Sequence, residues 1–168
     1  MSLSIYDVGN WSVNTNYNIY DIYRYNNLYY YAKYRHNSGS TFDEVFSDGV
    51  ISYNGVNRAN FFWKPSYNSD IEIKPSIRKA QFADGYTQRT IDGINSTLLP
   101  INLVFDKRTD AEARAILHFL ENRKGLSFVF IPPFPFNTTK LFCCESFRHS
   151  QIFANNHSIN AQFVETPV

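Results

Sequence analysis

Four histidines and two cysteines are the residues best suited to chemistry, and their spacing argues against a catalytic or metal site. The histidines are His36, His118, His149 and His157. His118 falls in a predicted helix without an HExxH pattern, so we expect a histidine at the helix surface or boundary rather than a metal ligand. His149 and Ser150 lie near Glu145, but sequence adjacency is a poor triad signal and no nucleophile elbow is present.

Cys143 and Cys144 are neighbours in the chain. Adjacent residues on a strand face opposite sides, so the two thiols are poorly placed to bond each other or to chelate one ion. With no third cysteine, we expect both to be reduced, one buried and one exposed.

Three aspartates, Asp84, Asp92 and Asp106, are the carboxylates that could serve as a paired acid and base. Two of them precede glycine, where aspartate is ordinary turn chemistry. The sequence also lacks the GxxxxGK[ST] and GxGxxG loops that bind phosphates. We therefore expect no enzyme, no cofactor and no metal.

The elements that would position these residues belong to one ordinary domain, or one domain plus a small module, because the chain has 168 residues. Apolar residues make up 43% and charged residues 18%, so a packed core is feasible. A formal charge of +1 argues against electrostatic binding of nucleic acid or anionic lipid. No apolar run is long enough to span a membrane and the start lacks a signal-peptide core, so we expect synthesis in the cytoplasm and no membrane insertion.

Tyrosine and phenylalanine are distributed differently along the chain. Ten of the 12 tyrosines lie within the first 53 residues, whereas 13 of the 15 phenylalanines follow Asn60. Residues 1–56 carry a net charge of −2 and residues 57–168 a net charge of +3. The polar stretch 54–60 is typical of a turn or linker. We therefore predict a small Tyr-rich β module over 1–56 and a second domain over 57–168.

In the first module, alternating tyrosines around Asn26-Asn27 predict a tight hairpin or three-stranded sheet closed by the turn at 38–40. A module this short cannot bury much, so we expect exposed tyrosines. In the second domain, strand-like runs occupy 61–63, 77–82, 101–105, 128–131, 141–147 and 159–164, with turn signals at Asp84-Gly85 and Asp92-Gly93. Thr109 and Glu112 read as a capping box that begins one helix, and Gly125 is suited to its end. The fold class is therefore mainly β with one flanking helix.

The aromatic residues of the first module have two interpretations. The spacing of Trp11, Tyr17, Tyr25 and Tyr30 resembles the small carbohydrate-binding modules attached to chitinases, over some twenty residues. That resemblance implies a glycan-binding or docking surface, and hence an alternative function as a host-adhesion protein. The other interpretation, which we favour, is that these rings form the core of the module, since small modules must use large side chains as core.

From Phe61 onward the chain resembles the phage minor tail protein family, the M-type tail-tip proteins of lambda-like siphophages. The blocks that carry the resemblance are Phe62–Pro65, Lys74–Lys79, Phe82–Arg89, Asp92–Asn95 and Phe128–Pro133. The resemblance spans residues 61–164 in order, and the Phe82–Arg89 block, F-A-D-G-Y-T-Q-R, is specific.

This resemblance implies a structural virion protein with a tail-tube-like β-sandwich or barrel. Such proteins form homo-oligomeric, six-membered rings at the distal end of the tail, joining tail-tube and tip-hub proteins around a channel through which DNA only passes. Fibres or host glycans are further candidate partners. Ring closure needs a heterologous interface, and we predict that Tyr86, Gln88 and Arg89 face a neighbouring subunit. The alternative for this block is a hairpin turn with Tyr86 in the core.

Overall fold

The computed structural model describes residues 8–66, 70–71, 77–81, 87–91 and 99–167, with backbone alone for the three short strands between 67 and 98. In chain order the elements are β1 (Asn16–Tyr17), β2 (Ile22–Tyr25), β3 (Leu28–Ala32), β4 (His36–Asn37), the 3-10 turn η1 (Glu44–Phe46), β5 (Ser47–Asp48), β6 (Val50–Tyr53), β7 (Val56–Phe61), β8 (Asp70–Ile71), β9 (Ile77–Gln81), β10 (Thr87–Ile91), β11 (Pro100–Arg108), α1 (Asp110–Arg123), β12 (Phe128–Phe130), β13 (Lys140–Phe153) and β14 (Asn156–Glu165). The predicted mainly-β fold with one flanking helix is confirmed for the described residues.

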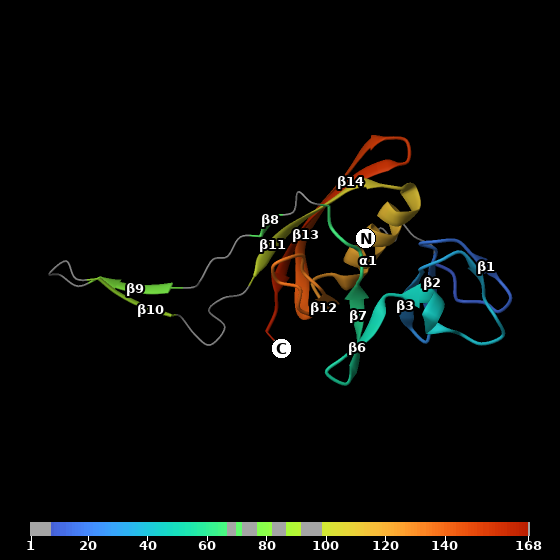
Figure 1. The fold of residues 1–168 in the computed structure, drawn as a ribbon, viewed down its shortest axis with the longest axis horizontal. Helices are drawn as coiled ribbons and strands as arrows, with labels where there is room; N and C mark the ends of the chain where they lie inside the picture. The colour runs from blue at the N-terminus through green and yellow to red at the C-terminus, as the bar shows by residue number, and fades with distance from the viewer. Residues whose placement is uncertain (1–7, 67–69, 72–76, 82–86, 92–98, 168) are drawn as a thin grey trace.

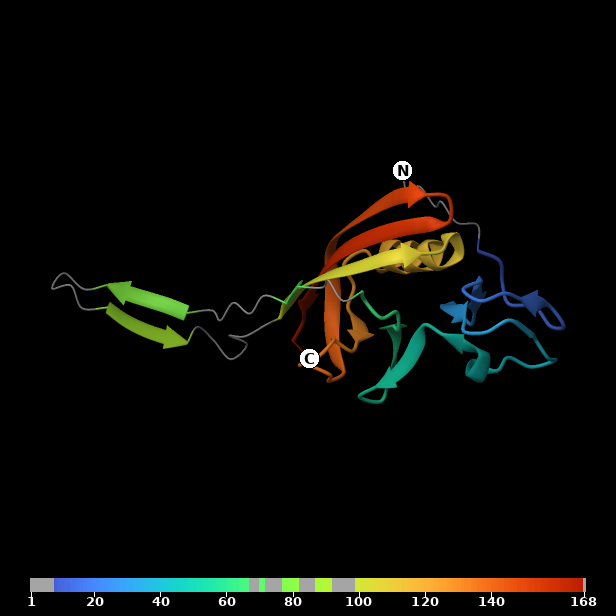
Figure 2. The ribbon, with the colours of Figure 1, turned by 45° about the horizontal axis from the view of Figure 1, so that its top comes forward.

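The largest sheet has seven strands in the order β6-β7-β12-β13-β14-β11-β8. Its pairs are antiparallel except β7 and β12, which run parallel with Asn60 opposite Val129 and Phe61 opposite Phe130. Figure 2 shows α1 lying against one face of this sheet, beneath the long β13–β14 hairpin. Phenylalanines fill the space between helix and sheet: Phe61, Phe105, Phe119, Phe128, Phe130 and Phe163 are each at most 2% exposed.

The helix follows the local signals of its sequence. The Thr109 hydroxyl accepts from the Glu112 N–H, as expected of an N-cap. At the other end Lys124 and Gly125 take left-handed φ values of 45° and 82°. Ile116 and Leu120 turn toward the core, so burial of one helix face supplies most of its stability.

The N-terminal residues form two small sheets, β2-β3-β5 and β1-β4. Asn26 and Asn27 have φ values of 48° and 62°, the geometry of the predicted tight hairpin turn. The expectation of exposed tyrosines is wrong for four of them: Tyr17, Tyr23, Tyr30 and Tyr31 are at most 9% exposed. The first three pack on one another, and Tyr31 enters the phenylalanine core.

The stretch 54–60 is a hairpin turn and a strand rather than a linker. Asn54 and Gly55 have positive φ and connect β6 to β7, both strands of the large sheet. The boundary predicted near residue 57 therefore falls within a hairpin, and the division into 1–56 and 57–168 stays a prediction.

Two further expectations are corrected. The strand expected at Phe61–Trp63 ends at Phe61, because its partner β12 ends at Phe130, just before prolines that cannot donate to a ladder. Cys143 and Cys144 are free thiols, and both are partly buried instead of one buried and one exposed. A register shift between Cys144 and Ser146 interrupts the alternation of faces at this point.

Candidate functional site

Two of the blocks that carry the family resemblance, Phe62–Pro65 and Phe128–Pro133, meet at a groove beside the β7–β12 pair. The groove has a volume of about 870 Å³ and is lined by residues 60–66 and by Phe130, Ile131, Pro132, Pro133, Phe134 and Asn137. Phe62 and Trp63 stack with ring centroids 4.0 Å apart. At the rim, Ile131 and Phe134 are 55% and 82% exposed. Parallel pairing of two strands distant in sequence therefore assembles an apolar surface of the kind that marks protein contacts.

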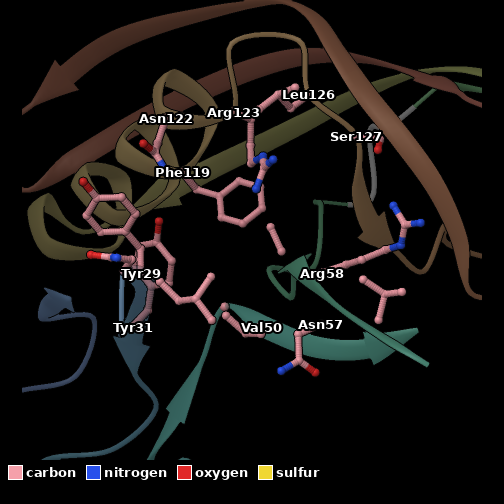
Figure 3. Close-up of a pocket in the computed structure, with 15 residues that line it drawn as sticks. Tyr29, Tyr31, Val50, Asn57, Arg58, Phe119, Asn122, Arg123, Leu126 and Ser127 are labelled. Atoms are coloured by element: carbon pink, nitrogen blue, oxygen red, sulfur yellow. The ribbon is translucent and has the colours of Figure 1, made fainter. Parts of the chain in front are cut away.

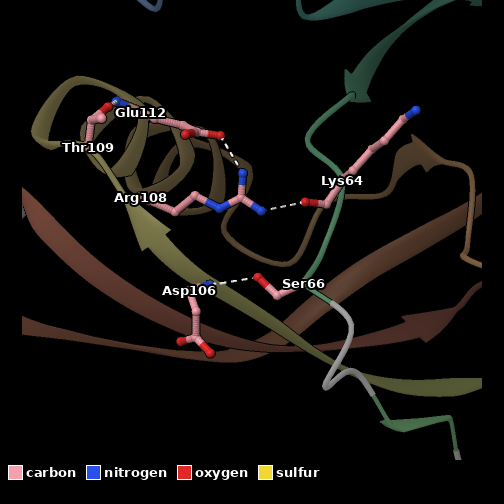
Figure 4. Close-up of polar contacts among 6 residues, drawn as sticks. All are labelled: Lys64, Ser66, Asp106, Arg108, Thr109 and Glu112. Atoms are coloured by element: carbon pink, nitrogen blue, oxygen red, sulfur yellow. Dashed lines mark hydrogen bonds and ion pairs between the residues drawn. The ribbon is translucent and has the colours of Figure 1, made fainter.

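Arg108 holds the Lys64 side of this groove in place (Figure 4). One guanidinium nitrogen donates to the Lys64 carbonyl at 2.7 Å, and another forms an ion pair with Glu112 at 2.7 Å. A register shift between Phe105 and Arg108, with Lys107 at φ 58°, lets Arg108 reach both groups. Ser66 adds a second anchor, since its hydroxyl accepts from the Asp106 N–H at 2.9 Å. These contacts fix the loop after β7 to the sheet and helix.

Two of the three predicted interface residues, Gln88 and Arg89, lie on β10 of the β9–β10 ribbon. Gln88 pairs with Ala80 and Arg89 with Lys79 in the antiparallel register. Tyr86, together with Asp84-Gly85 and Asp92-Gly93, lies outside the described residues. Figures 1 and 2 show β9 and β10 beyond the end of the large sheet, apart from the helix and the N-terminal strands. The assignment of these three residues to a subunit interface stays a prediction.

The four residues of the predicted glycan or docking surface come together, but as a packed cluster. Tyr17 and Tyr30 are buried, while Trp11 and Tyr25 are partly buried and lie against Phe42. The Trp11 and Tyr25 rings meet edge-on at 5.6 Å, and Tyr25 stacks on Phe42 at 4.0 Å. Burial raises the pKa of the Tyr30 hydroxyl, with nearby Glu44 adding to the shift. These contacts are those of a small core; glycan binding by this surface stays a prediction.

His118 lies at the boundary between α1 and the N-terminal strands, and it is buried. Its Nδ1 lies 3.0 Å from the Tyr31 hydroxyl, and only 7% of the residue is exposed. Burial lowers the pKa of this imidazole to about 4, so the ring is neutral at pH 7. The histidine thus joins two parts of the chain as an uncharged hydrogen-bonding partner.

Three titratable side chains form a hydrogen-bonded chain that the sequence analysis did not predict. His149 Nε2 lies 2.8 Å from His157 Nδ1, and His157 Nε2 lies 2.6 Å from Asp110 Oδ1. Burial lowers the pKa of His149, and His157 contributes further. The positions of His149 and His157 on either side of the turn at Asn155 could have indicated this contact, since hairpin strands bring such residues together. Asp110 is supplied by the start of α1.

No metal site or membrane span is found in the described ranges. Within them, no three His, Cys, Asp or Glu side chains gather closely enough to hold a metal ion. Nor does any helix there have the length and apolar character needed to cross a membrane.

Comparison with known proteins assigns the chain to the structural proteins of bacteriophage tails. Residues 59–166 match the phage minor tail protein family, and the chain belongs to this family. It is 34% identical over 86 residues to tail tip protein M of Escherichia phage lambda, covering 51% of this chain and 78% of that protein. Against tail tip protein M of Escherichia phage N15 it is 40% identical over 63 residues, covering 36% of this chain and about half (52%) of that protein.

One solved structure is a more distant match. The tail of an empty GTA particle, refined helically with C6 symmetry, gives a TM-score of 0.38 at 14% identity, over 60% of this chain and 75% of the other. A likeness of this level does not inform the fold or the assembly of this chain.

Proposed function

We propose that the chain assembles with copies of itself into a closed ring at the distal end of the phage tail, between the tail tube and the tip hub. The family resemblance suggests six copies, around a channel through which DNA passes. The relatives named tail tip protein M support the location at the tip. In this proposal the chain is synthesised in the host cytoplasm, and its role in the tail is structural and not enzymatic.

The observation that carries this proposal is the β9–β10 ribbon. A two-stranded ribbon alone is at best marginally stable in water, because it has no third strand or packed face. In this chain β9 and β10 pair only with each other among the described strands, and Figure 1 shows them away from the main body. A neighbouring subunit would supply the missing packing surface, with Tyr86, Gln88 and Arg89 at the contact.

The groove beside β7 and β12 supplies a second contact surface in this ring. Phe134 at 82% exposure and Ile131 at 55% leave apolar area in water that a neighbouring tail protein would cover. A heterologous interface needs two different surfaces on each subunit, and the ribbon and the groove are two such surfaces.

The Tyr-rich residues 1–56 are proposed to project outward from the ring as a module. Binding of host glycans by Trp11 and its neighbours is tested separately, with the full chain and Trp11→Ala on a glycan array. Equal signals from both proteins would end that idea.

Native mass spectrometry and imaging of tail tips test the ring. Six copies of the 19.6-kDa chain have a mass of about 118 kDa. We expect this species from purified protein or from isolated tips, and its loss in Arg89→Glu. Arg35→Glu, at an exposed site in the loop between β3 and β4, is the matched control and should keep this species. A chain that is strictly monomeric and absent from virions would refute the proposal.

A further inference from the structure

A second cavity lies where the β2–β3 hairpin, the β6–β7 hairpin and the end of α1 meet. Its volume is about 490 Å³, and its wall includes Tyr29, Tyr31, Phe119, Arg58 and Arg123. Figure 3 shows Arg123 reaching from the helix into the space above β6 and β7, with Arg58 extending from β7 on the side nearer Ser127. The cavity is distinct from the groove beside β12 and takes no part in the proposed ring contacts.

The charge of this cavity is unbalanced. The residues that line it, all of them described, include two arginines and no aspartate or glutamate. Neither arginine forms an ion pair with any residue in the described ranges, and the Nε atom of each is buried without a hydrogen-bond partner. Burial also lowers the pKa of Arg123, although the nearby Tyr31 hydroxyl acts in the opposite direction. Two partly buried cations therefore lack a counter-charge, which is energetically costly.

Part of the remaining wall of the cavity is apolar, and Asn27, Asn57, Asn122 and Ser127 supply uncharged polar groups. Tyr31 and Phe119 form part of the wall, with ring centroids 6.1 Å apart. At the edge, Leu126 and Val56 are 61% and 52% exposed. A partner that fits this surface combines one negative group with an apolar neighbour.

We propose that this cavity binds an acidic side chain from another tail protein, presented on a segment that has an apolar residue beside the carboxylate. The guanidinium fork of arginine matches the two oxygens of a carboxylate, and Arg123 is the main contact because it lies over the middle of the cavity. Arg58 adds positive charge at the side. The exposed leucine and valine favour a peptide over a phosphate, since a phosphate gains nothing from apolar area. With a net charge of +1 and two arginines in one cavity, the chain also lacks the extended basic surface that nucleic acid needs.

The test is an NMR titration of the full ¹⁵N-labelled chain that follows the Nε–H signals of Arg58 and Arg123. The probes are the blocked peptides acetyl-Ala-Glu-Leu-Ala-amide and acetyl-Ala-Gln-Leu-Ala-amide, and inorganic phosphate at the same ionic strength. We expect the glutamate peptide to move both signals and to bind about tenfold or more tightly than the glutamine peptide.

Substitutions of the two arginines test whether peptide binding depends on their positive charge or on the guanidinium geometry. Arg123→Gln should abolish binding of the glutamate peptide, Arg123→Lys should weaken it, and Arg58→Gln should weaken it less than Arg123→Gln. Arg35→Gln, at an exposed position that is not part of the lining, should bind as the wild type does. A lysine variant with a native spectrum keeps the test valid if the glutamine variant does not fold.

Three results would overturn the inference: equal binding of the two peptides, arginine signals that do not move, or phosphate moving them as strongly as the glutamate peptide. The last would define a small-anion site instead. The readout is binding to a single chain, so failure of ring formation would not affect it.

Discussion

Acid is expected to weaken the junction between the N-terminal strands and α1, because it charges His118. The imidazole is 7% exposed and lies 3.0 Å from the hydroxyl of Tyr31, which is itself 1% exposed. The Tyr29 ring adds an edge contact with centroids 4.8 Å apart. A proton on this ring would place a positive charge in a buried junction, and burial disfavours that charged form.

The sign and size of the effect follow from the pKa. An unfolded chain protonates this histidine near pH 6.5, whereas burial lowers the pKa in the folded chain to about 4. Between these values the unfolded chain binds more protons, so the free energy of unfolding falls as the pH falls from about 6.5 to about 4. The difference in pKa corresponds to at most about 3 kcal/mol, and solvent screening at the junction reduces the expected loss to about 2 kcal/mol.

Urea denaturation of the wild type and of His118→Asn across this pH range measures the loss. Asparagine keeps a polar group near the position of Nδ1 but does not titrate. The titration of side chains common to both proteins cancels in this comparison. The free energy of unfolding of the wild type should therefore fall by about 2 kcal/mol more than that of the variant. Parallel curves for the two proteins, or an NMR titration of His118 with a midpoint near 6.5, would refute the reasoning.

Three further outcomes test the fold. Thr109→Ala should cost about 1 kcal/mol in urea denaturation through loss of the helix cap, and Thr109→Ser should cost much less; equal losses would contradict the capping role. Gly49→Ala should cost about 2 kcal/mol or more, because φ is +119° and an added Cβ would lie 2.8 Å from a backbone carbonyl oxygen, whereas Gly39→Ala has open space and should be near neutral. Iodoacetamide at pH 8 should alkylate Cys143 before Cys144, since burial raises the pKa of Cys144 to about 12, and peptide mass spectrometry would show the reverse order if this is wrong.

Features that depend on neighbouring residues could be predicted from the sequence. Thr109 and Gly125 mark the two ends of α1 because capping is decided within one turn of helix. Asn26 and Asn27 give the β2–β3 turn for the same reason, since asparagine tolerates positive φ. The mainly-β fold also followed from the alternation of residues in the strand-like runs.

Features that depend on distant contacts could not be predicted. Tyr31 is buried because it meets His118, 87 residues further along the chain. The groove exists because β7 and β12 pair in parallel, which brings two motif blocks together that are separate in sequence. The Asp110–His157–His149 chain joins the start of α1 to the β13–β14 hairpin. The sequence of either element alone does not indicate its contact with the other.

The pairing of β6 with β7 has a consequence for how such proteins can be exchanged between phages. The family region begins at residue 59, in the middle of β7, so its first strand depends on residues 50–53 for its antiparallel partner. Tyr31, from further upstream, packs on Trp63 with ring centroids 5.0 Å apart inside the same core. Recombination that replaced everything before residue 59 would have to bring both an edge strand and a large ring with the new segment. The part of the gene that must be inherited together is therefore longer than the part by which the family is recognised.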